Sequence, residues 1–239
     1  ATKEIVWQWR SWDHIVQDHD ATKLSYGDIL ENKELININY ALRENGDIMH
    51  ANGIFYDATR DVLFVSINHY SEVWVIDHQY NVAETAGELG DLLFRLGNPR
   101  AYKDTVASVF LDRTHTPNLI PEGYPGAGNL LLFNNGLKAK KSVVYEFDIP
   151  EKLTIEDIEK ADLIWSFSDK NLSYGRISGA YRLSNGNTLI CEGDYGFWEI
   201  TDQKEIVWQY KDVSTTFWRG YPIDQSHKLF NLVSDITDN

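Results

Sequence analysis

The sequence predicts an all-β fold, a β-propeller built from four-stranded antiparallel blades, and three observations lead to this prediction. Aromatic residues make up 13% of the 239 residues, a composition rich in strand-forming side chains. A pattern of four short apolar strands occurs three times, with starts at His50, His115 and Ser178 that lie 65 and then 63 residues apart. Glycine, asparagine and aspartate, which favour turns, separate the strands. Four short strands that repeat at a near-constant interval are typical of propeller blades.

Each repeat opens with a strand that begins at a polar residue. The three opening segments are "HANGIFYD" (50–57), "HTPNLIPEG" (115–123) and "SGAYRLSNG" (178–186). Strongly apolar second strands follow at 62–68, 129–135 and 188–193, third strands at 72–77, 143–149 and 196–201, and closing strands at 90–97, 161–168 and 205–210. The predicted blades therefore span residues 50–97, 115–168 and 178–210 within a single domain of residues 1–239. Residues 154–161 are expected to form up to two helical turns on the surface.

The two ends of the chain leave two ways to complete the ring. "TKEIVWQW" (2–9) resembles "QKEIVWQY" (203–210), so we expect an outer strand at 4–9. Residues 1–10 could pair with residues 215–235 as a composite partial blade. Alternatively, the chain is the C-terminal portion of a larger propeller. We favour this second interpretation, because three or four blades make a tight ring.

Composition excludes several classes of partner and site. The net charge of −14 repels nucleic acids and anionic membranes, and no run of 18 apolar residues is present to span a bilayer. Cys191 is the only cysteine, which excludes an internal disulfide and a thiolate metal cluster. The phosphate-binding, dinucleotide, zinc-protease and serine-hydrolase motifs GxxxxGK, GxGxxG, HExxH and GxSxG are absent. We therefore expect no cofactor and no metal, and interpret "WDHIVQDHD" (12–20) as a solvated loop. The chain begins at Ala1, as a mature or trimmed product would.

Polar residues at the blade starts are the candidate site. The first strand of each propeller blade lines the central channel, so His50, Asn52, His115 and Ser178 should meet at one mouth of it. Ligands bind in such concave, polar places. The alternative is that these side chains only cap backbone groups in the channel.

Six segments resemble the bacterial arylsulfotransferases that do not use a nucleotide sulfate donor. The segments are "EIVWQWRSWDHIVQDHD", "HANGIFYDATRDVLFVS", "HYSEVWVIDH", "GDLLFRLGNPRAY", "IPEGYPGAGNLLLFNNG" and "SGAYRLSNGNTLICEG". The resemblance implies a six-bladed propeller with further blades upstream of residue 1. It also implies transfer of a sulfuryl group from an aryl sulfate donor to a phenolic acceptor through a sulfohistidine, and a periplasmic or secreted location.

Carried onto this chain, the resemblance makes His115 the nucleophile and His50 the general acid and base. Asn52 completes the H-x-N pair of the family and would bind sulfuryl oxygens. Asn68 stands where family members usually have an arginine, which removes a permanently charged clamp. Arg176 is a candidate replacement for that cation. "TPN" follows His115 where the family tends to have D-A-H, and a further family histidine lies upstream of this chain.

These departures leave two functions open. The first is an aryl sulfate sulfotransferase, active alone or with its missing blades or a second chain completing the ring. The second is a catalytically impaired propeller that binds a small ligand or a protein.

Overall fold

The computed structural model describes residues 3–158, 160–173, 176–212 and 214–223. Within them the chain forms three four-stranded antiparallel sheets, each with its strands in chain order. Blade 1 contains β3 (Ala51–Asp57), β4 (Val62–Ile67), β5 (Glu72–Asp77) and β6 (Leu92–Leu96). Blade 2 contains β7 (Thr114–Leu119), β8 (Leu130–Asn134), β9 (Val143–Asp148) and β10 (Asp162–Phe167). Blade 3 contains β11 (Gly179–Arg182), β12 (Thr188–Glu192), β13 (Gly196–Ile200) and β14 (Ile206–Lys211). The predicted all-β propeller class is confirmed.

The remaining elements are short. They are the parallel pair β1 (Ile15–Val16) and β2 (Ile36–Asn37), and the 3-10 helices η1 (Ser11–Asp13), η2 (Glu84–Ala86), η3 (Glu88–Gly90), η4 (Pro99–Tyr102) and η5 (Ile155–Asp157). Thus the expected helical segment at 154–161 is reduced to the single turn η5. In the described residues, no helix has both the length and the apolar character needed to cross a bilayer.

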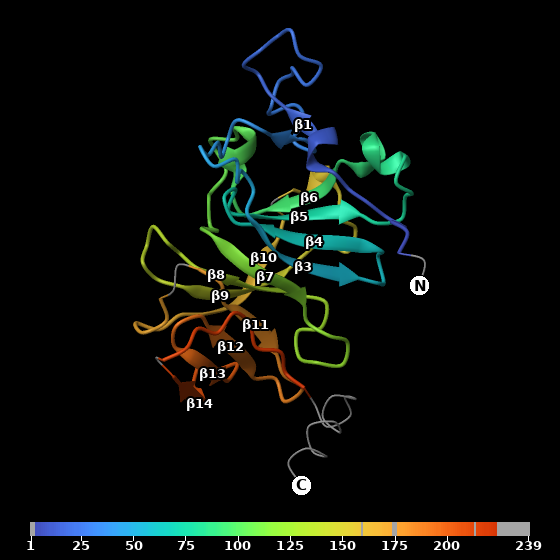
Figure 1. Cartoon of the computed structure of the whole chain (residues 1–239). Helices are drawn as coiled ribbons and strands as arrows, with labels where there is room; N and C mark the ends of the chain where they lie inside the picture. The colour runs from blue at the N-terminus through green and yellow to red at the C-terminus, as the bar shows by residue number, and fades with distance from the viewer. Residues whose placement is uncertain (1–2, 159, 174–175, 213, 224–239) are drawn as a thin grey trace.

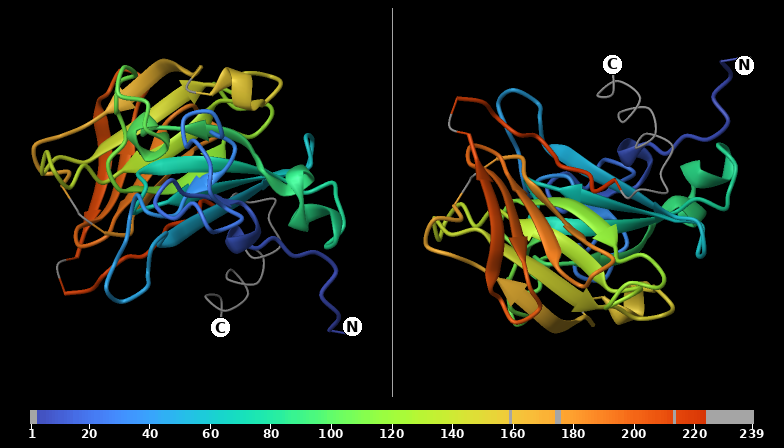
Figure 2. Two further views of the ribbon diagram at one scale, coloured as in Figure 1. Left: turned by 90° about the horizontal axis from the view of Figure 1, so that it is seen from above. Right: turned by 90° about the horizontal axis from the view of Figure 1, so that it is seen from below.

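The first strands of the three blades are held against one another. Strand β3 contacts β7, and β7 contacts β11, so the blades follow one another in chain order (Figures 1 and 2). Two side chains bond across these contacts at the same sequence offset of 62 residues. Asn52 Nδ2 donates to the carbonyl of Thr114 at 3.2 Å, and Thr116 Oγ1 donates to the carbonyl of Ser178 at 2.9 Å. The blade starts therefore lie at one end of the molecule.

The second strands fill the space between the blades. All residues of β8 are buried, and they alternate between two hydrophobic clusters. Leu130 and Leu132 pack with Phe64 of blade 1, whereas Leu131 and Phe133 pack toward Trp198 of blade 3. Because successive side chains of a strand point to opposite faces, an apolar run serves both neighbours at once. This explains why the middle strands read as continuous apolar segments.

A buried ion pair of blade 1 also binds the N-terminal segment. Arg95 donates to the Glu72 carboxylate at 2.6 Å, and both side chains are fully buried. The other terminal nitrogen of Arg95 donates to the carbonyls of Lys33 and Leu35, at 3.0 and 3.1 Å. Trp74 Nε1 donates to the same Glu72 oxygen at 2.7 Å. One guanidinium thus fastens residues 33–35 to the sheet.

The expected outer strand at 4–9 is not formed. Residues 3–10 have no ladder partner among the described residues, and the side chains of Ile5 and Val6 are 73% and 88% exposed. The similar segment in β14 forms a strand because β13 offers it a hydrogen-bonding edge. A composite blade was expected from residues 1–10 paired with residues 215–235. Residues 215–223 also form no strand, and residues 224–235 lie outside the described part of the chain. Similar sequences therefore differ in structure because only one of them meets a free edge.

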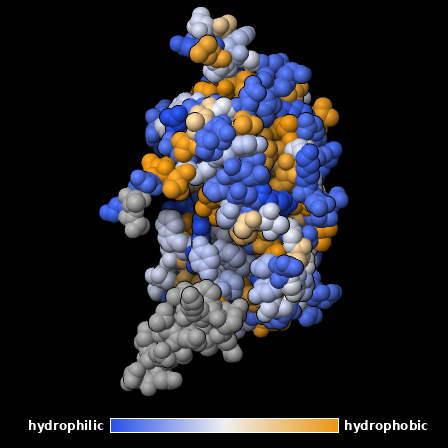
Figure 3. Space-filling model, turned by 90° about the vertical axis from the view of Figure 1, so that its right-hand side faces the viewer, coloured by the Kyte–Doolittle hydropathy of each residue, from blue (hydrophilic) through white to orange (hydrophobic). Residues whose placement is uncertain are grey.

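Exposed hydrophobic side chains gather on the last strand of the array. Val207, Trp208 and Tyr210 of β14 are each about half exposed, at 53%, 49% and 45%. On the face seen in Figure 3, hydrophobic residues form separate patches among hydrophilic ones. The apolar exposure of β14 is the expected state of an outer strand without a further neighbour.

We expect Arg95→Met to lower the free energy of unfolding by about 3–5 kcal/mol, because it leaves the carboxylate of Glu72 buried without its cation. Urea unfolding followed by tryptophan fluorescence measures this change. The double variant Glu72→Leu/Arg95→Met should recover most of the loss. Arg10→Met, which breaks the exposed pair with Asp13, should change stability by less than about 1 kcal/mol. Equal losses of stability in Arg95→Met and Arg10→Met would contradict the larger contribution assigned to the buried Glu72–Arg95 pair.

Candidate functional site

Irregular backbone marks the start of the first strand in blades 1 and 2. The β3–β4 register shifts between Ala51 and Gly53, and the β7–β8 register shifts between His115 and Asn118. His50 and Thr116 have positive φ angles of 51° and 53°, which are uncommon for residues other than glycine. Bulges of this kind re-aim side chains and occur often beside functional sites. Both predicted histidines therefore lie where the strands depart from regular geometry.

His115 is buried and held in one tautomer. Its Nδ1 lies 2.5 Å from Asn135 Oδ1, while Asn135 Nδ2 donates to the carbonyl of Ile177 at 3.1 Å. Because a backbone carbonyl only accepts, it fixes the orientation of the Asn135 amide, and the amide oxygen must then accept from His115 Nδ1–H. Nε2 consequently carries the lone pair of the neutral ring.

Burial also keeps His115 uncharged. It lowers the pKa of His115 to about 4, although hydrogen bonding to Asn135 and to the backbone of Arg113 opposes this shift. The charges of His50 and Arg219 lower the pKa further, which indicates that both groups lie near this imidazole. At neutral pH His115 is therefore a neutral imidazole with a lone pair on one ring nitrogen, the state in which imidazole is a nucleophile.

His50 belongs to a second, more exposed group of side chains. Its Nδ1 lies 2.5 Å from Asp47 Oδ2, and its backbone N–H donates to Asp47 Oδ1 at 3.0 Å. The hydrogen bond from His50 holds the pKa of Asp47 below its ordinary value. The ring of His50 stacks on that of His69 with centroids 5.0 Å apart, and His69 Nδ1 donates to the Asp47 carbonyl at 2.7 Å. We call these three residues the Asp47–His50–His69 cluster.

Asn52 joins blades 1 and 2. Its Oδ1 accepts from Ser66 Oγ at 2.5 Å, and its Nδ2 donates to Thr114 as described above. Its backbone carbonyl accepts a hydrogen bond from Arg219. Within the described part of the chain, the second proton of the Asn52 amide has no hydrogen-bond acceptor, and the rest of the amide serves the contact between blades.

Two arginines approach the predicted site from segments that sequence reasoning did not select. Asn68 is buried, and its Oδ1 accepts from the guanidinium of Arg113 at 3.0 Å. Burial lowers the pKa of Arg113. Arg219 reaches Asn52 from the segment that follows blade 3.

The predicted residue Arg176 lies on an exposed turn just before β11, beside the Ile177 carbonyl that orients Asn135.

Asn135, Arg113 and Arg219 were not predicted as site residues, and they differ in how strong a signal each leaves in the sequence. Asn68 and Asn135 are the last residues of the repeat segments 62–68 and 129–135, so aligning the repeats more closely would have singled out Asn135. Arg113 directly precedes the His115 segment, but its contact with Asn68 depends on two blades meeting. Arg219 follows the last repeat, and no pattern in the sequence connects it with Asn52.

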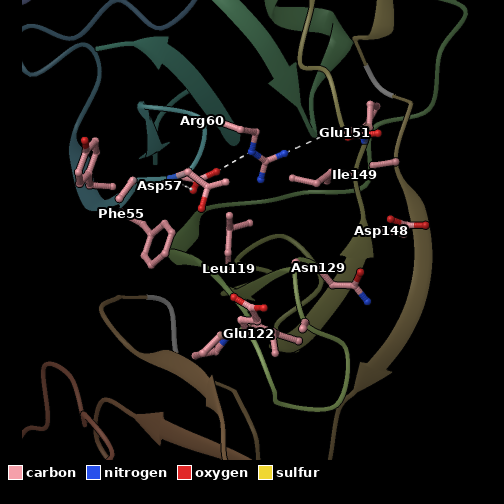
Figure 4. Close-up of a pocket in the computed structure, with 18 of the residues that line it drawn as sticks. Phe55, Asp57, Arg60, Leu119, Glu122, Asn129, Asp148, Ile149 and Glu151 are labelled. Carbon is pink, nitrogen blue, oxygen red and sulfur yellow. Dashed lines mark hydrogen bonds and ion pairs between the residues drawn. The ribbon is translucent and has the colours of Figure 1, made fainter. Parts of the chain in front are cut away.

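A large cavity lies at the opposite end of the same strands. It has a volume of about 1170 Å³ and lies between blades 1 and 2, where Phe55, Asp57 and Leu119 line it (Figure 4). Asp57 lies seven residues beyond His50, so the extended chain places it roughly 20 Å from the histidine. The cavity is therefore separate from the His50 and His115 end.

Comparison with known proteins identifies the family of the chain. A family model described as arylsulfotransferase (ASST) matches residues 1–220. No curated protein matches the sequence. Among solved structures, the β-propeller domain of Cps50 (Swd1) from Myceliophteria thermophila is similar, with 14% identity and a TM-score of 0.43. The similarity covers 80% of this chain and 47% of that one, so this chain spans about half of its length.

We expect the buried, neutral His115 to make folding stability depend on pH. The folded pKa of about 4 lies below the ordinary value of 6.5, so the unfolded chain binds more protons between these two values. Stability should therefore fall as the pH drops from about 6.5 to about 4, by up to about 3 kcal/mol from this residue. Urea unfolding of the wild type and of His115→Gln at pH 4, 5, 6 and 7 measures it. The free energy of unfolding of His115→Gln should depend less steeply on pH than that of the wild type. Parallel curves of this free energy against pH would contradict the lowered pKa of His115.

Proposed function

The chain belongs to the arylsulfotransferase family, and on this basis we propose that it transfers a sulfuryl group from an aryl sulfate to a phenol through a sulfohistidine on His115. The observation that carries the proposal is the state of His115, which is buried, neutral and fixed with its lone pair on Nε2. A side chain that only capped the backbone would not need a second blade to orient its partner. The periplasmic or secreted location that the resemblance implies stays a prediction.

In the first half-reaction His115 Nε2 attacks the sulfur of the donor. An N–S bond forms, the bond between sulfur and the aryl oxygen breaks, and the phenol leaves with a proton from His50. The ring of His115 becomes a sulfated imidazolium, whose Nδ1–H remains bound to Asn135 Oδ1. In the second half-reaction His50 takes the proton of the acceptor phenol, whose oxygen attacks the sulfur. The N–S bond breaks and its electron pair returns to Nε2.

Asp47 is the group that prepares His50 for this role. Its carboxylate accepts from Nδ1–H and from the backbone N–H of His50, which leaves Nε2 of the ring for proton exchange. A carboxylate that orients an imidazole and stabilises its cationic form is the arrangement found in hydrolase triads. His50 is half exposed, so it can reach a phenol that enters from solvent.

Arg113 supplies the cation that Asn68 lacks. The three sulfuryl oxygens gain charge during transfer and need fixed donors around them. Asn68 Oδ1 engages one arm of the Arg113 guanidinium, so the positive charge stands beside the position where relatives carry an arginine. Arg219 provides a second cation at the carbonyl of Asn52. The role predicted for Arg176 stays a prediction.

The alternative function is a propeller that binds a small phenolic or anionic ligand, or a protein, without transferring a group. The engagement of the Asn52 amide between the blades favours it, because this amide is then only partly available to sulfuryl oxygens. A covalent intermediate separates the two functions.

We expect wild-type protein treated with 4-nitrophenyl sulfate alone to gain the mass of one sulfuryl group, located on His115 by peptide mapping. Adding a phenol should remove the adduct and release nitrophenolate continuously. His115→Ala should lose both signals, and His78→Ala, at a histidine paired with Asp61 elsewhere in blade 1, should keep both. Ligand binding without any adduct would support the alternative function and refute the transferase.

We expect Arg113→Gln to lower kcat/KM for 4-nitrophenyl sulfate by about 10²-fold, because it removes a charge that stabilises the transition state. Arg113→Lys should recover part of this loss, since an ammonium keeps the charge but not the fork geometry. Steady-state kinetics with a fixed phenol acceptor measure both variants. Wild-type kinetics for Arg113→Gln would show that the guanidinium does not act on the sulfuryl group.

A further inference from the structure

We propose that the Asp47–His50–His69 cluster is a binding site for a borderline transition-metal cation such as Zn²⁺, and that metal bound there inhibits sulfuryl transfer. A carboxylate oxygen of Asp47 and a ring nitrogen from each histidine lie within 4.8 Å of one another. Of the described residues, only these three form such a group. The acidic and histidine-rich segment 12–20, by contrast, does not bring its side chains together in this way.

The hydrogen bonds of the cluster leave both imidazoles ready to coordinate. His69 Nδ1 faces a backbone carbonyl, which only accepts, so the proton of the neutral ring is on Nδ1 and the lone pair is on Nε2. His50 Nδ1 faces the carboxylate of Asp47, so a cation that replaces the proton between them would have His50 Nδ1 and the Asp47 oxygen as neighbouring ligands. Within the described residues, no hydrogen bond engages the Nε2 atom of His69. A histidine fixed by a carbonyl or carboxylate at its other nitrogen is the usual form of a metal ligand.

The spacing of the cluster is close to that of a bound metal. Ligand atoms at 2.0–2.2 Å from a tetrahedral Zn²⁺ lie about 3.3–3.6 Å apart, so the most widely spaced atoms of the cluster have to approach one another by on the order of 1 Å. His50 can supply this movement, because its side chain is 52% exposed.

The donor set selects the class of metal. Two imidazole nitrogens and one carboxylate suit Zn²⁺, Cu²⁺ or Ni²⁺, whereas Mg²⁺ and Ca²⁺ prefer sites made of oxygen alone. With three protein ligands, the remaining positions of the metal are left to water or to an anion. The cluster is therefore expected to bind Zn²⁺ and to ignore Mg²⁺.

Metal at this site removes the general acid and base of the transfer reaction. With Nδ1 of His50 bound to Zn²⁺, the proton of the ring lies on Nε2, so the ring cannot accept a proton from the phenol and gives up its own proton much less readily than an imidazolium does. This inhibition rests on the proposed function, whereas the binding of metal does not. The two can therefore be tested separately.

The first test is titration of the metal-free chain with ZnCl₂, followed by calorimetry and by metal analysis after dialysis. We expect one Zn²⁺ per wild-type chain, at least tenfold weaker binding for His69→Ala, and wild-type binding for His78→Ala, whose histidine pairs with Asp61 but has no second imidazole beside it. MgCl₂ should give no heat of binding. Because His69 is partly buried, the more exposed His50→Gln provides a second variant, which should also bind at least tenfold more weakly. Equal Zn²⁺ affinity in the wild type, His69→Ala and His50→Gln would overturn the site.

The second test measures nitrophenolate release with and without Zn²⁺. Wild-type transfer should be inhibited by Zn²⁺ and restored by EDTA, and His69→Ala should resist the same Zn²⁺ concentration. Inhibition of both to the same extent would overturn the regulatory role. A wild-type chain that binds Zn²⁺ at His69 but forms no sulfohistidine would refute the proposed function and still support the metal site.

Discussion

Contact between the first strands of neighbouring blades is the constraint on which the remaining structure depends. Asn52 bonds to Thr114 and Thr116 bonds to Ser178, and each bond joins residues 62 positions apart. These bonds place the starts of successive repeats side by side, so residues far apart in the chain share one end of the molecule. The orientation of His115 by Asn135, which a third blade holds in turn, is a direct consequence of this stacking.

Burial of polar groups has two different outcomes in this fold. Glu72 and Arg95 are both fully buried and form an ion pair. Arg95 also donates to a carbonyl of the N-terminal segment and so holds that segment against blade 1. Among the described residues, no carboxylate pairs with His115, and burial holds it neutral with a pKa of about 4. Desolvation therefore requires a cationic partner for the Glu72 carboxylate, whereas it keeps the His115 imidazole in its neutral, nucleophilic form. The difference lies in whether the charged state of the residue has a neighbour that stabilises it.

The fold was largely predictable because its signals are local and repeated. Alternation within strands, turn residues between them and a near-constant period predicted three blades close to the observed β3–β6, β7–β10 and β11–β14. The prediction was wrong for residues 4–9, which resemble residues 205–210 in and beside β14 but form no strand. Strand formation depends on a free hydrogen-bonding edge as well as on sequence, and that edge is a property of the assembled sheets.

By itself, the sequence determined the class of fold and the family, and it marked two histidines as candidate site residues, because each signal is encoded in short segments that repeat or match as written. Tertiary structure alone decided the surroundings of those histidines. It brought Arg113 to Asn68, Arg219 to Asn52 and His69 to His50, although none of these contacts leaves a pattern in the chain. The physical reason is that pKa, tautomer and charge balance are set by neighbours in space, and the packing of blades chooses those neighbours.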